Sequence, residues 1–217
     1  SSAASDVYKR QFLDWLLREI RKNEIDALII AGDVFDVSNP SAASQRMYYE
    51  FIYRVTAENP GLQIVIVAGN HDSAARLEAP LPLLQAMRTE VRGVVRKLNE
   101  GEIDYDHLAV ELKNREGEVE VLCMAVPFLR QGDYPVVETE GNPYMEGVRE
   151  LYTQLLQRLW ARRKTNQAIL AIGHLQATGS EIAEKDYSER TVIGGLECVS
   201  PDTFSEKIAY TALGHIH

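Results

Sequence analysis

The sequence has few cysteines and lacks any long hydrophobic run. Two cysteines, Cys123 and Cys198, occur in 217 residues, and both have apolar neighbours. This usage is typical of buried free thiols in a reducing cytoplasm, whereas a disulfide-stapled secreted domain would need more cysteines. No apolar run approaches the roughly 20 residues that span a bilayer. We therefore expect a cytoplasmic, globular protein.

Positive charge is also scarce. The 23 Lys and Arg residues are outnumbered by 32 Asp and Glu, which gives a formal net charge of −9. This balance argues against a protein that holds nucleic acid by bulk electrostatic attraction. It is compatible with an enzyme whose acidic residues bind metal cations. The apolar share of 45% and the charged share of 25% are those of an ordinary globular protein with one large or two small domains.

Short apolar runs alternate with segments of helical periodicity. Helices are predicted at residues 12–22, 41–57, 79–87 and 143–164. Ser41 is the expected N-cap of the second of these helices. Buried strands are predicted at 26–34, 62–69, 167–174 and 207–215. A β-hairpin is predicted at 107–128, around "NREG". This alternation predicts an α/β fold with an added hairpin.

Each of the four predicted strands ends in a glycine followed by polar residues. The candidate residues at these ends are Asp33 and Asp36 in "GDVFD", Asn70, His71 and Asp72 in "GNHD", His174 in "GHL", and His215 and His217 in "GHIH". Ligands of α/β proteins collect at the carboxyl ends of strands, where side chains from different strands can converge. We therefore expect the four clusters to meet in space. The fifth histidine, His107, lies in an acidic stretch and is expected at the surface.

Taken singly, each cluster has a structural explanation as a capped turn or a hydrogen-bonded core histidine. Taken together they favour a metal site, because burying so many imidazoles and carboxylates without cations would cost several kcal/mol each. Oxygen and nitrogen donors without a thiolate suit manganese, iron or zinc. A carboxylate such as Asp33 can bridge two ions about 3.5–4 Å apart, which is the spacing of two-metal phosphoester hydrolases.

The motifs "DALIIAGDVFD", "VAGNHDS", "VPFLRQGDY" and "YTALGHIH" resemble those of the calcineurin-like metallophosphoesterase superfamily. The closer likeness is to its SbcD family of bacterial nuclease subunits, over residues 12–217. The resemblance implies an α/β/β/α sandwich of two mixed β-sheets flanked by helices. It also implies a DNA exonuclease and hairpin-cleaving endonuclease that acts in DNA repair, recombination and replication.

The resemblance also implies a role for each candidate residue. Asp33 would bridge two divalent ions, preferably Mn²⁺; the other metal ligands would be Asn70, His174, His215 and His217. His71 would lie over the scissile phosphate, and Asp72 would orient its ring, since an imidazole held by a carboxylate can donate a proton near neutral pH. Asp36 would contact the metal ligands without binding a metal ion itself.

The implied partners are DNA, an SbcC-type ATPase and a second copy of the chain, so that a homodimer lies within a heterotetramer. These partners would supply DNA-binding surface to an acidic protein. Three alternatives stay open: a phosphatase or phosphodiesterase of the same superfamily that acts on a small substrate, a binding protein with a degenerate metal site, and a protein in which the clusters are only capped turns.

The sequence departs from the family pattern at its start. Residues 1–11 have no hydrophobic period, and one back-translation of them is a transposase sequencing adapter, so we expect a segment foreign to the domain. The family opens with an Asp-x-His strand, and no histidine precedes Asp33. We expect the domain to be incomplete at both ends, with its first strand missing. The chain should therefore keep a second-metal site, lack a complete first one and have little activity.

Overall fold

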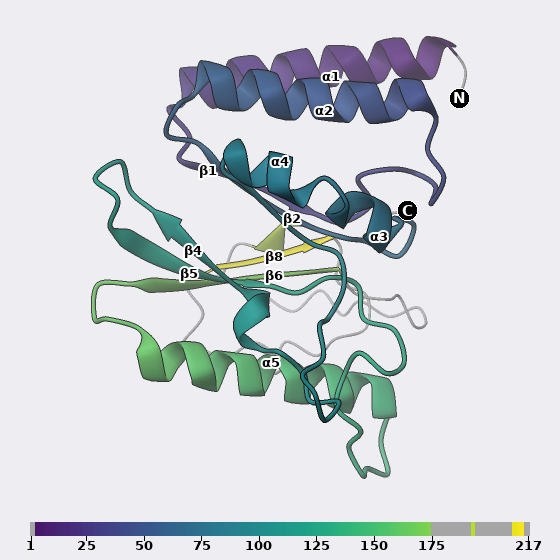
Figure 1. Cartoon of the computed structure of the whole chain (residues 1–217), viewed down its shortest axis with the longest axis vertical. Helices are drawn as coiled ribbons and strands as arrows, with labels where there is room; N and C mark the ends of the chain where they lie inside the picture. The colour runs from purple at the N-terminus through teal and green to yellow at the C-terminus, as the bar shows by residue number, and fades with distance from the viewer. Residues whose placement is uncertain (1–2, 175–191, 194–209, 215–217) are drawn as a thin grey trace.

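The computed structural model describes residues 3–174, 192–193 and 210–214. Two β-sheets lie face to face between two layers of helices (Figure 1). The first sheet has the order β1-β2-β3, with β1 (Ala27–Ala31), β2 (Gln63–Val67) and β3 (Thr89–Arg92). The second has the order β4-β5-β6-β8-β7, with β4 (Ala109–Lys113), β5 (Val119–Ala125), β6 (Ala168–His174), β7 (Val192–Ile193) and β8 (Tyr210–Gly214).

Helices cover the outer face of each sheet. The first sheet is covered by α1 (Ala3–Lys22), α2 (Ala42–Glu58), α3 (Ala74–Glu78) and α4 (Leu81–Ala86). The second sheet is covered by α5 (Pro143–Arg162), and a short 3₁₀ helix, η1 (Asp106–Leu108), leads into β4. The Ser41 hydroxyl accepts a hydrogen bond from Ser44 N at 3.1 Å, which confirms the predicted N-cap of α2.

Strand periodicity divides the core into three layers. On β2, Ile64 and Ile66 pack against the helices, while Val65 and Val67 pack against the second sheet. The same alternation holds on β5 and β6, because successive side chains of a strand point to opposite faces. The interface between the sheets is built from small and branched side chains: Val65, Val67, Val110, Leu112, Cys123, Ala125, Leu170 and Ile172. This α/β/β/α arrangement confirms the predicted fold class.

Two predictions about the sheets need correction. Only the second sheet is mixed, with β4 and β5 antiparallel; the described strands of the first sheet are all parallel. Strand β1 was expected to be buried on both faces, but all five of its residues are half-buried. The reason is its position, since β1 forms an edge of the described sheet and has a hydrogen-bonded neighbour on one side only. Strand β3 and helix α3 were not predicted.

Helix α1 is longer than its sequence pattern indicates. It begins at Ala3, nine residues before the predicted start at Phe12. Within the added turns, Val7 and Tyr8 are exposed and contribute nothing to the core. The expectation that residues 1–11 are foreign to the domain stays a prediction.

His107 is another correction. It was expected at the surface, but it is half-buried, and its Nε2 atom is buried without a hydrogen-bond partner. Burial lowers the pKa of His107, and the nearby charges of Arg92 and Arg96 lower it further. The cause is local: Leu108 is drawn fully into the core, and Arg92 Nε donates to the carbonyl of His107 at 2.6 Å.

Cys123 is a fully buried free thiol, as expected, and burial raises its pKa above the ordinary range. Cys198 lies outside the described residues. Among the described helices, none is both long enough and apolar enough to cross a membrane.

Tyr152 joins α5 to β6, the strand that ends at His174, by a hydrogen bond. Its hydroxyl donates to the carbonyl of Ile172 at 3.1 Å in a fully buried setting, and burial raises the pKa of this phenol. We expect Tyr152→Phe to lower the free energy of unfolding by about 1 kcal/mol, which is the net value of one hydrogen bond. Urea denaturation measures this change. Tyr53→Phe on exposed α2 surface is the matched control and should change stability by less than about 0.5 kcal/mol; equal effects would contradict the prediction.

Candidate metal centre

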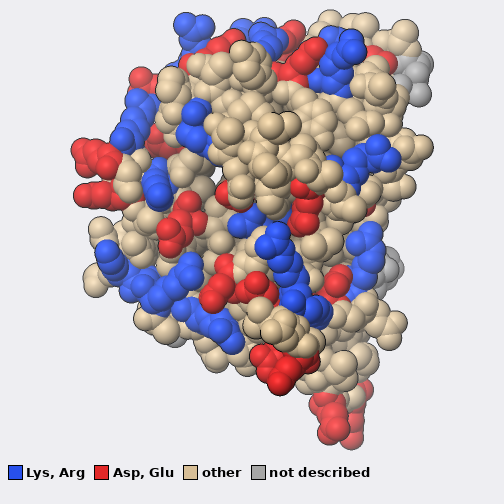
Figure 2. Space-filling model, in the orientation of Figure 1, with Lys and Arg blue, Asp and Glu red and all other residues tan. Residues whose placement is uncertain are grey.

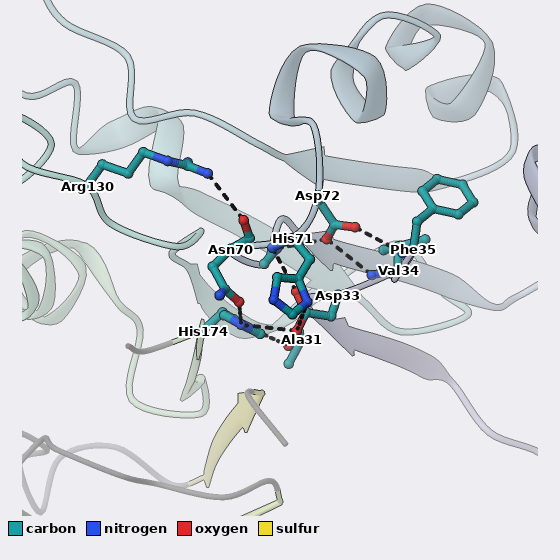
Figure 3. Close-up of polar contacts among 10 residues, drawn as sticks. Ala31, Asp33, Val34, Phe35, Asn70, His71, Asp72, Arg130 and His174 are labelled. Atoms are coloured by element: carbon teal, nitrogen blue, oxygen red, sulfur yellow. Dashed lines mark hydrogen bonds and ion pairs between the residues drawn. The ribbon is translucent and has the colours of Figure 1, made fainter. Parts of the chain in front are cut away.

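Asp33 is placed by a sharp turn at the end of β1. Gly32 has φ +87° and Asp33 itself has φ 47°, so two successive residues adopt the left-handed conformation. Glycine adopts it freely, and aspartate tolerates it better than most residues. The turn brings the Asp33 carboxylate to the end of β2, where Oδ1 accepts the backbone N–H of His71 at 3.2 Å (Figure 3).

Asp72 holds this turn in place. Its carboxylate accepts three backbone N–H groups, from Gly69 at 2.8 Å, Phe35 at 3.0 Å and Val34 at 3.1 Å. The residue is almost fully buried, and this burial raises the pKa of Asp72 although the three hydrogen bonds lower it. The nearby Asp33 carboxylate raises it further. Asp72 therefore joins the ends of β1 and β2, and its expected role in orienting His71 stays a prediction.

His174 reaches the same place from the second sheet. It is the last residue of β6, is 1% exposed, and its Nδ1 lies 3.1 Å from the carbonyl oxygen of Ala31. Because a carbonyl oxygen can only accept, this contact places a hydrogen on Nδ1. The other ring nitrogen, Nε2, lies 2.9 Å from Asn70 Oδ1 and 3.6 Å from Asp33 Oδ2. The ring thus bridges the two sheets.

The atoms around Nε2 form a set of donors suited to a cation. With hydrogen on Nδ1, a neutral His174 presents a lone pair at Nε2, and Asn70 Oδ1 and Asp33 Oδ2 present lone pairs beside it. Three such atoms repel one another unless a proton or a metal ion lies among them. Two ligands about 2.1 Å from an octahedral ion and at right angles lie about 3 Å apart, close to the observed 2.9 Å. The residues therefore fit a divalent metal ion.

His71 lies beside this donor set and is more open to solvent. Its Nδ1 is 3.8 Å from Asp33 Oδ2, and its side chain is 37% exposed. In Figure 3 its ring lies next to the Asp33 carboxylate, and the expected role of His71 as a proton donor stays a prediction.

Two glycines allow the parts to come this close. A Cβ atom on Gly32 would overlap the ring of His174, and one on Gly69 would overlap the backbone N and the carboxylate of Asp33. The glycines that precede the polar clusters are therefore needed for close packing as well as for the turn.

The loop after β5 also reaches this edge and was missed as part of the site. Phe128 N donates to the carbonyl of Ala68 at 2.8 Å, and the Phe128 ring meets His174 edge-on with centroids 6.2 Å apart. Arg130 Nη2 lies 3.5 Å from the carbonyl oxygen of Asn70 (Figure 3). The signal was available, because "VPFLR" follows the buried strand β5 just as the other clusters follow theirs.

The structure does not bring every candidate into the cluster. Asp36 points away: its side chain is 82% exposed and its Oδ2 pairs with Lys9 Nζ at 3.0 Å. His215 and His217 lie outside the described residues. Strand β8 ends just before them at Gly214, the register partner of His174. Within the described part of the chain, no three His, Cys, Asp or Glu side chains form a metal-binding group, and the donor set described above includes the Asn70 amide oxygen.

A layered α/β chain with Asp, Asn and His converging at its strand ends is typical of metal-dependent hydrolases. Similarity to known proteins defines the class of hydrolase more narrowly. A model of the calcineurin-like phosphoesterase family matches residues 4–217, and the chain belongs to this family. Divalent metal ions are what this family implies for the site.

The curated relatives include two that are named as nuclease subunits. The chain is 36% identical over 215 residues to the SbcD subunit of the nuclease SbcCD from Rhodobacter capsulatus, a match that covers 96% of this chain and 52% of the relative. It is 29% identical over 223 residues to the SbcD protein of Escherichia coli, covering 100% of this chain and 52% of that protein. A shorter match, 33% identical over 85 residues, covers 38% of this chain and 17% of the DNA double-strand break repair protein Mre11 of Methanopyrus kandleri. The chain spans about half the length of the SbcD relatives.

Close packing at Gly69 gives a test of the metal centre. In Gly69→Ala the new methyl group must displace Asp33, so we expect Mn²⁺ binding to weaken by about 10- to 100-fold, as for other losses of support around a metal ligand. Isothermal titration calorimetry measures the affinity. Gly61→Ala, where the nearest atom would be 3.5 Å away, is the matched control and should bind as the wild type does. Equal affinities in the two variants would contradict the assignment.

Proposed function

We propose that this chain is the greater part of the catalytic domain of an SbcD-type DNA nuclease, and that the full-length protein hydrolyses phosphodiester bonds as an exonuclease and as a hairpin-cleaving endonuclease in DNA repair and recombination. The observation that carries the proposal is the convergence of Asp33, Asn70 and His174 donor atoms around one point between two sheets. The choice of DNA over a small substrate rests on the relatives, which are named as nuclease subunits.

The proposed cofactor is a pair of divalent ions, preferably Mn²⁺. Asp33, Asn70 and His174 would hold them, together with His215 and His217, which follow the end of β8 in the sequence. When bound, two such ions supply a nucleophilic hydroxide at neutral pH and neutralise charge on the phosphate. Oxygen and imidazole donors without thiolate suit manganese.

His71 is the proposed general acid. Its imidazole lies beside Asp33 and keeps access to solvent, so it can reach a phosphate at the donor set and pass a proton to the leaving oxygen. Asp72 acts on this group through the backbone: by binding the N–H groups of Gly69 and Val34 it fixes the loop from which His71 projects.

The proposed partners are DNA, an SbcC-type ATPase and a second copy of the chain, in the cytoplasm. The buried free thiol of Cys123 suits that reducing compartment. Lys and Arg are interspersed with Asp and Glu over most of the face shown in Figure 2, and a short band of Lys and Arg lies at its lower left. Partner chains would add DNA-binding surface to this acidic protein.

Helix α1 supports the proposed homodimer. Leu17 and Ile20 are buried against the protein, yet Phe12 and Trp15 on another face are 54% and 48% exposed. The two rings lie 5.9 Å apart and form one apolar patch. A helix that is apolar on more than one face is usually covered on each, and a second copy of α1 would cover this patch by two-fold symmetry.

Activity is tested on a protein of the relatives' full length that carries residues 12–217, called the full-length protein below. We expect Mn²⁺-dependent cleavage of duplex and hairpin DNA, and we expect His71→Gln to lower kcat by about 10²- to 10⁴-fold, as loss of a general acid does. His107→Gln, the same change at the half-buried histidine near Arg92, should keep most of the activity. The readout is release of labelled product on a denaturing gel.

The same assay separates the alternatives. Hydrolysis of a chromogenic phosphodiester with no cleavage of DNA would favour the small-substrate phosphodiesterase. DNA cleavage that survives His71→Gln would contradict the role of this residue, and a full-length protein without bound metal would favour capped turns.

The proposed dimer is tested by placing a charged residue in the apolar patch of α1. We expect Trp15→Glu to convert the full-length protein from a dimer to a monomer, because a carboxylate buried at an apolar interface is costly. Light scattering after size exclusion measures the mass. Val136→Glu, at a residue that is 97% exposed on a loop, should leave the dimer intact. A wild type that is monomeric, or a Trp15→Glu variant that stays dimeric, would rule out this interface.

A further inference from the structure

The loop that carries Arg130 is held rigidly beside the metal centre. Leu129 is 1% exposed and packs in the core under α5, and Phe128 N is hydrogen-bonded to Ala68 at the end of β2. Arg130 and Asp133 close a tight turn: Arg130 N donates to Asp133 Oδ2 at 2.8 Å, and Asp133 N donates to the Arg130 carbonyl at 2.9 Å. The backbone of Arg130 is therefore fixed relative to the end of β2.

The guanidinium of Arg130 is held over this edge with much of its hydrogen-bonding capacity unused. Its Cζ lies 5.0 Å from the centre of the Phe128 ring, a cation–π distance. Within the described part of the chain it makes one long hydrogen bond, 3.5 Å to Asn70 O, although a guanidinium has five N–H donors. Among the described residues, no ion pair joins a carboxylate to it, and the nearby Asp133 carboxylate accepts the backbone N–H of Arg130 instead. The residue is exposed to solvent.

Its neighbours link this cation to the donor set. The residue whose carbonyl Arg130 contacts, Asn70, is the residue whose side chain faces His174. The ring under the guanidinium, Phe128, also meets the ring of His174. We therefore expect a polynucleotide bound with one phosphate at the donor set to place a neighbouring phosphate near Arg130. A planar guanidinium binds phosphate through paired hydrogen bonds, and a cation on an aromatic ring is already oriented for it.

We propose that Arg130 is a positioning residue that binds a strand phosphate next to the phosphate being cleaved, and thereby favours polynucleotides over substrates with a single phosphodiester. This inference rests on the proposed function of the site. A purely structural role for Arg130, as a cover on Phe128, would instead affect all substrates alike.

The test compares Arg130→Gln with the wild-type full-length protein on two substrates in Mn²⁺. For a single-stranded oligonucleotide we expect KM to rise about tenfold or more, the value of a charge-assisted hydrogen bond, with a small change in kcat. For bis(p-nitrophenyl) phosphate, which has no neighbouring phosphate, we expect a much smaller change in kcat/KM. In oligonucleotide binding followed by fluorescence anisotropy, the slope of log K against log salt should become shallower by about 0.7, because one phosphate contact is lost.

The control is Arg163→Gln. Arg163 has a matching environment, with its Cζ 4.3 Å from the Trp160 ring centre and Nη2 bonded to Thr165 O, but it follows α5 near the start of β6, at the other end of that strand from His174. It should behave as the wild type, and Arg130→Lys should recover most of the salt slope. Equal losses on both substrates, or an unchanged slope, would overturn the inference. If the wild type binds the oligonucleotide but hydrolyses neither substrate, the proposed function fails, while the slopes still decide the role of Arg130.

Discussion

The arrangement of the site depends on one buried carboxylate. Asp72 accepts N–H groups from Gly69, Val34 and Phe35, and so ties the turn after β1 to the turn after β2. Desolvation opposes its charge and raises the pKa of Asp72, and three hydrogen bonds to the charged form offset part of that cost. Without this clamp, a turn that places Asp33 at φ 47° would have little to hold it, because left-handed backbone persists only where its surroundings fix it. Asp72 thus caps the two turns by accepting their backbone N–H groups. These hydrogen bonds fix the positions of Asp33 and His71.

The candidate metal centre lies between the ends of the two sheets. Its geometry therefore depends on how the two sheets pack against each other. Asp33 and Asn70 come from the first sheet and His174 from the second. The side chains between the sheets are small or branched, and close packing of such side chains keeps the sheets at a fixed separation. Gly32 allows the His174 ring to lie close to the turn after β1, because any side chain at position 32 would overlap this ring. A change in sheet packing would therefore alter the distances between these donor atoms.

Local patterns predicted the elements, and tertiary context decided what was missed. The hairpin, the α2 cap and the buried strand β2 each follow from residues that lie next to one another. The half-buried state of β1 could not be predicted this way, because it depends on which strands pair with β1 in space. For the site, the strand-end rule brought Asp33, Asn70 and His174 together correctly. The same rule included Asp36, since spacing alone cannot show that this side chain turns outward.

The net charge of −9 does not conflict with a phosphate-bearing substrate. At physiological ionic strength exposed charges are screened over about 8 Å, so the field at the centre is set by the nearest groups rather than by the total. Near it, the Asp33 and Asp72 carboxylates are engaged with backbone N–H groups, and the donor set has lone pairs suited to cations. Bound ions would change the sign of this local field, and Arg130 already adds positive charge at its rim. An acidic chain can thus present a locally positive site once cations are bound there.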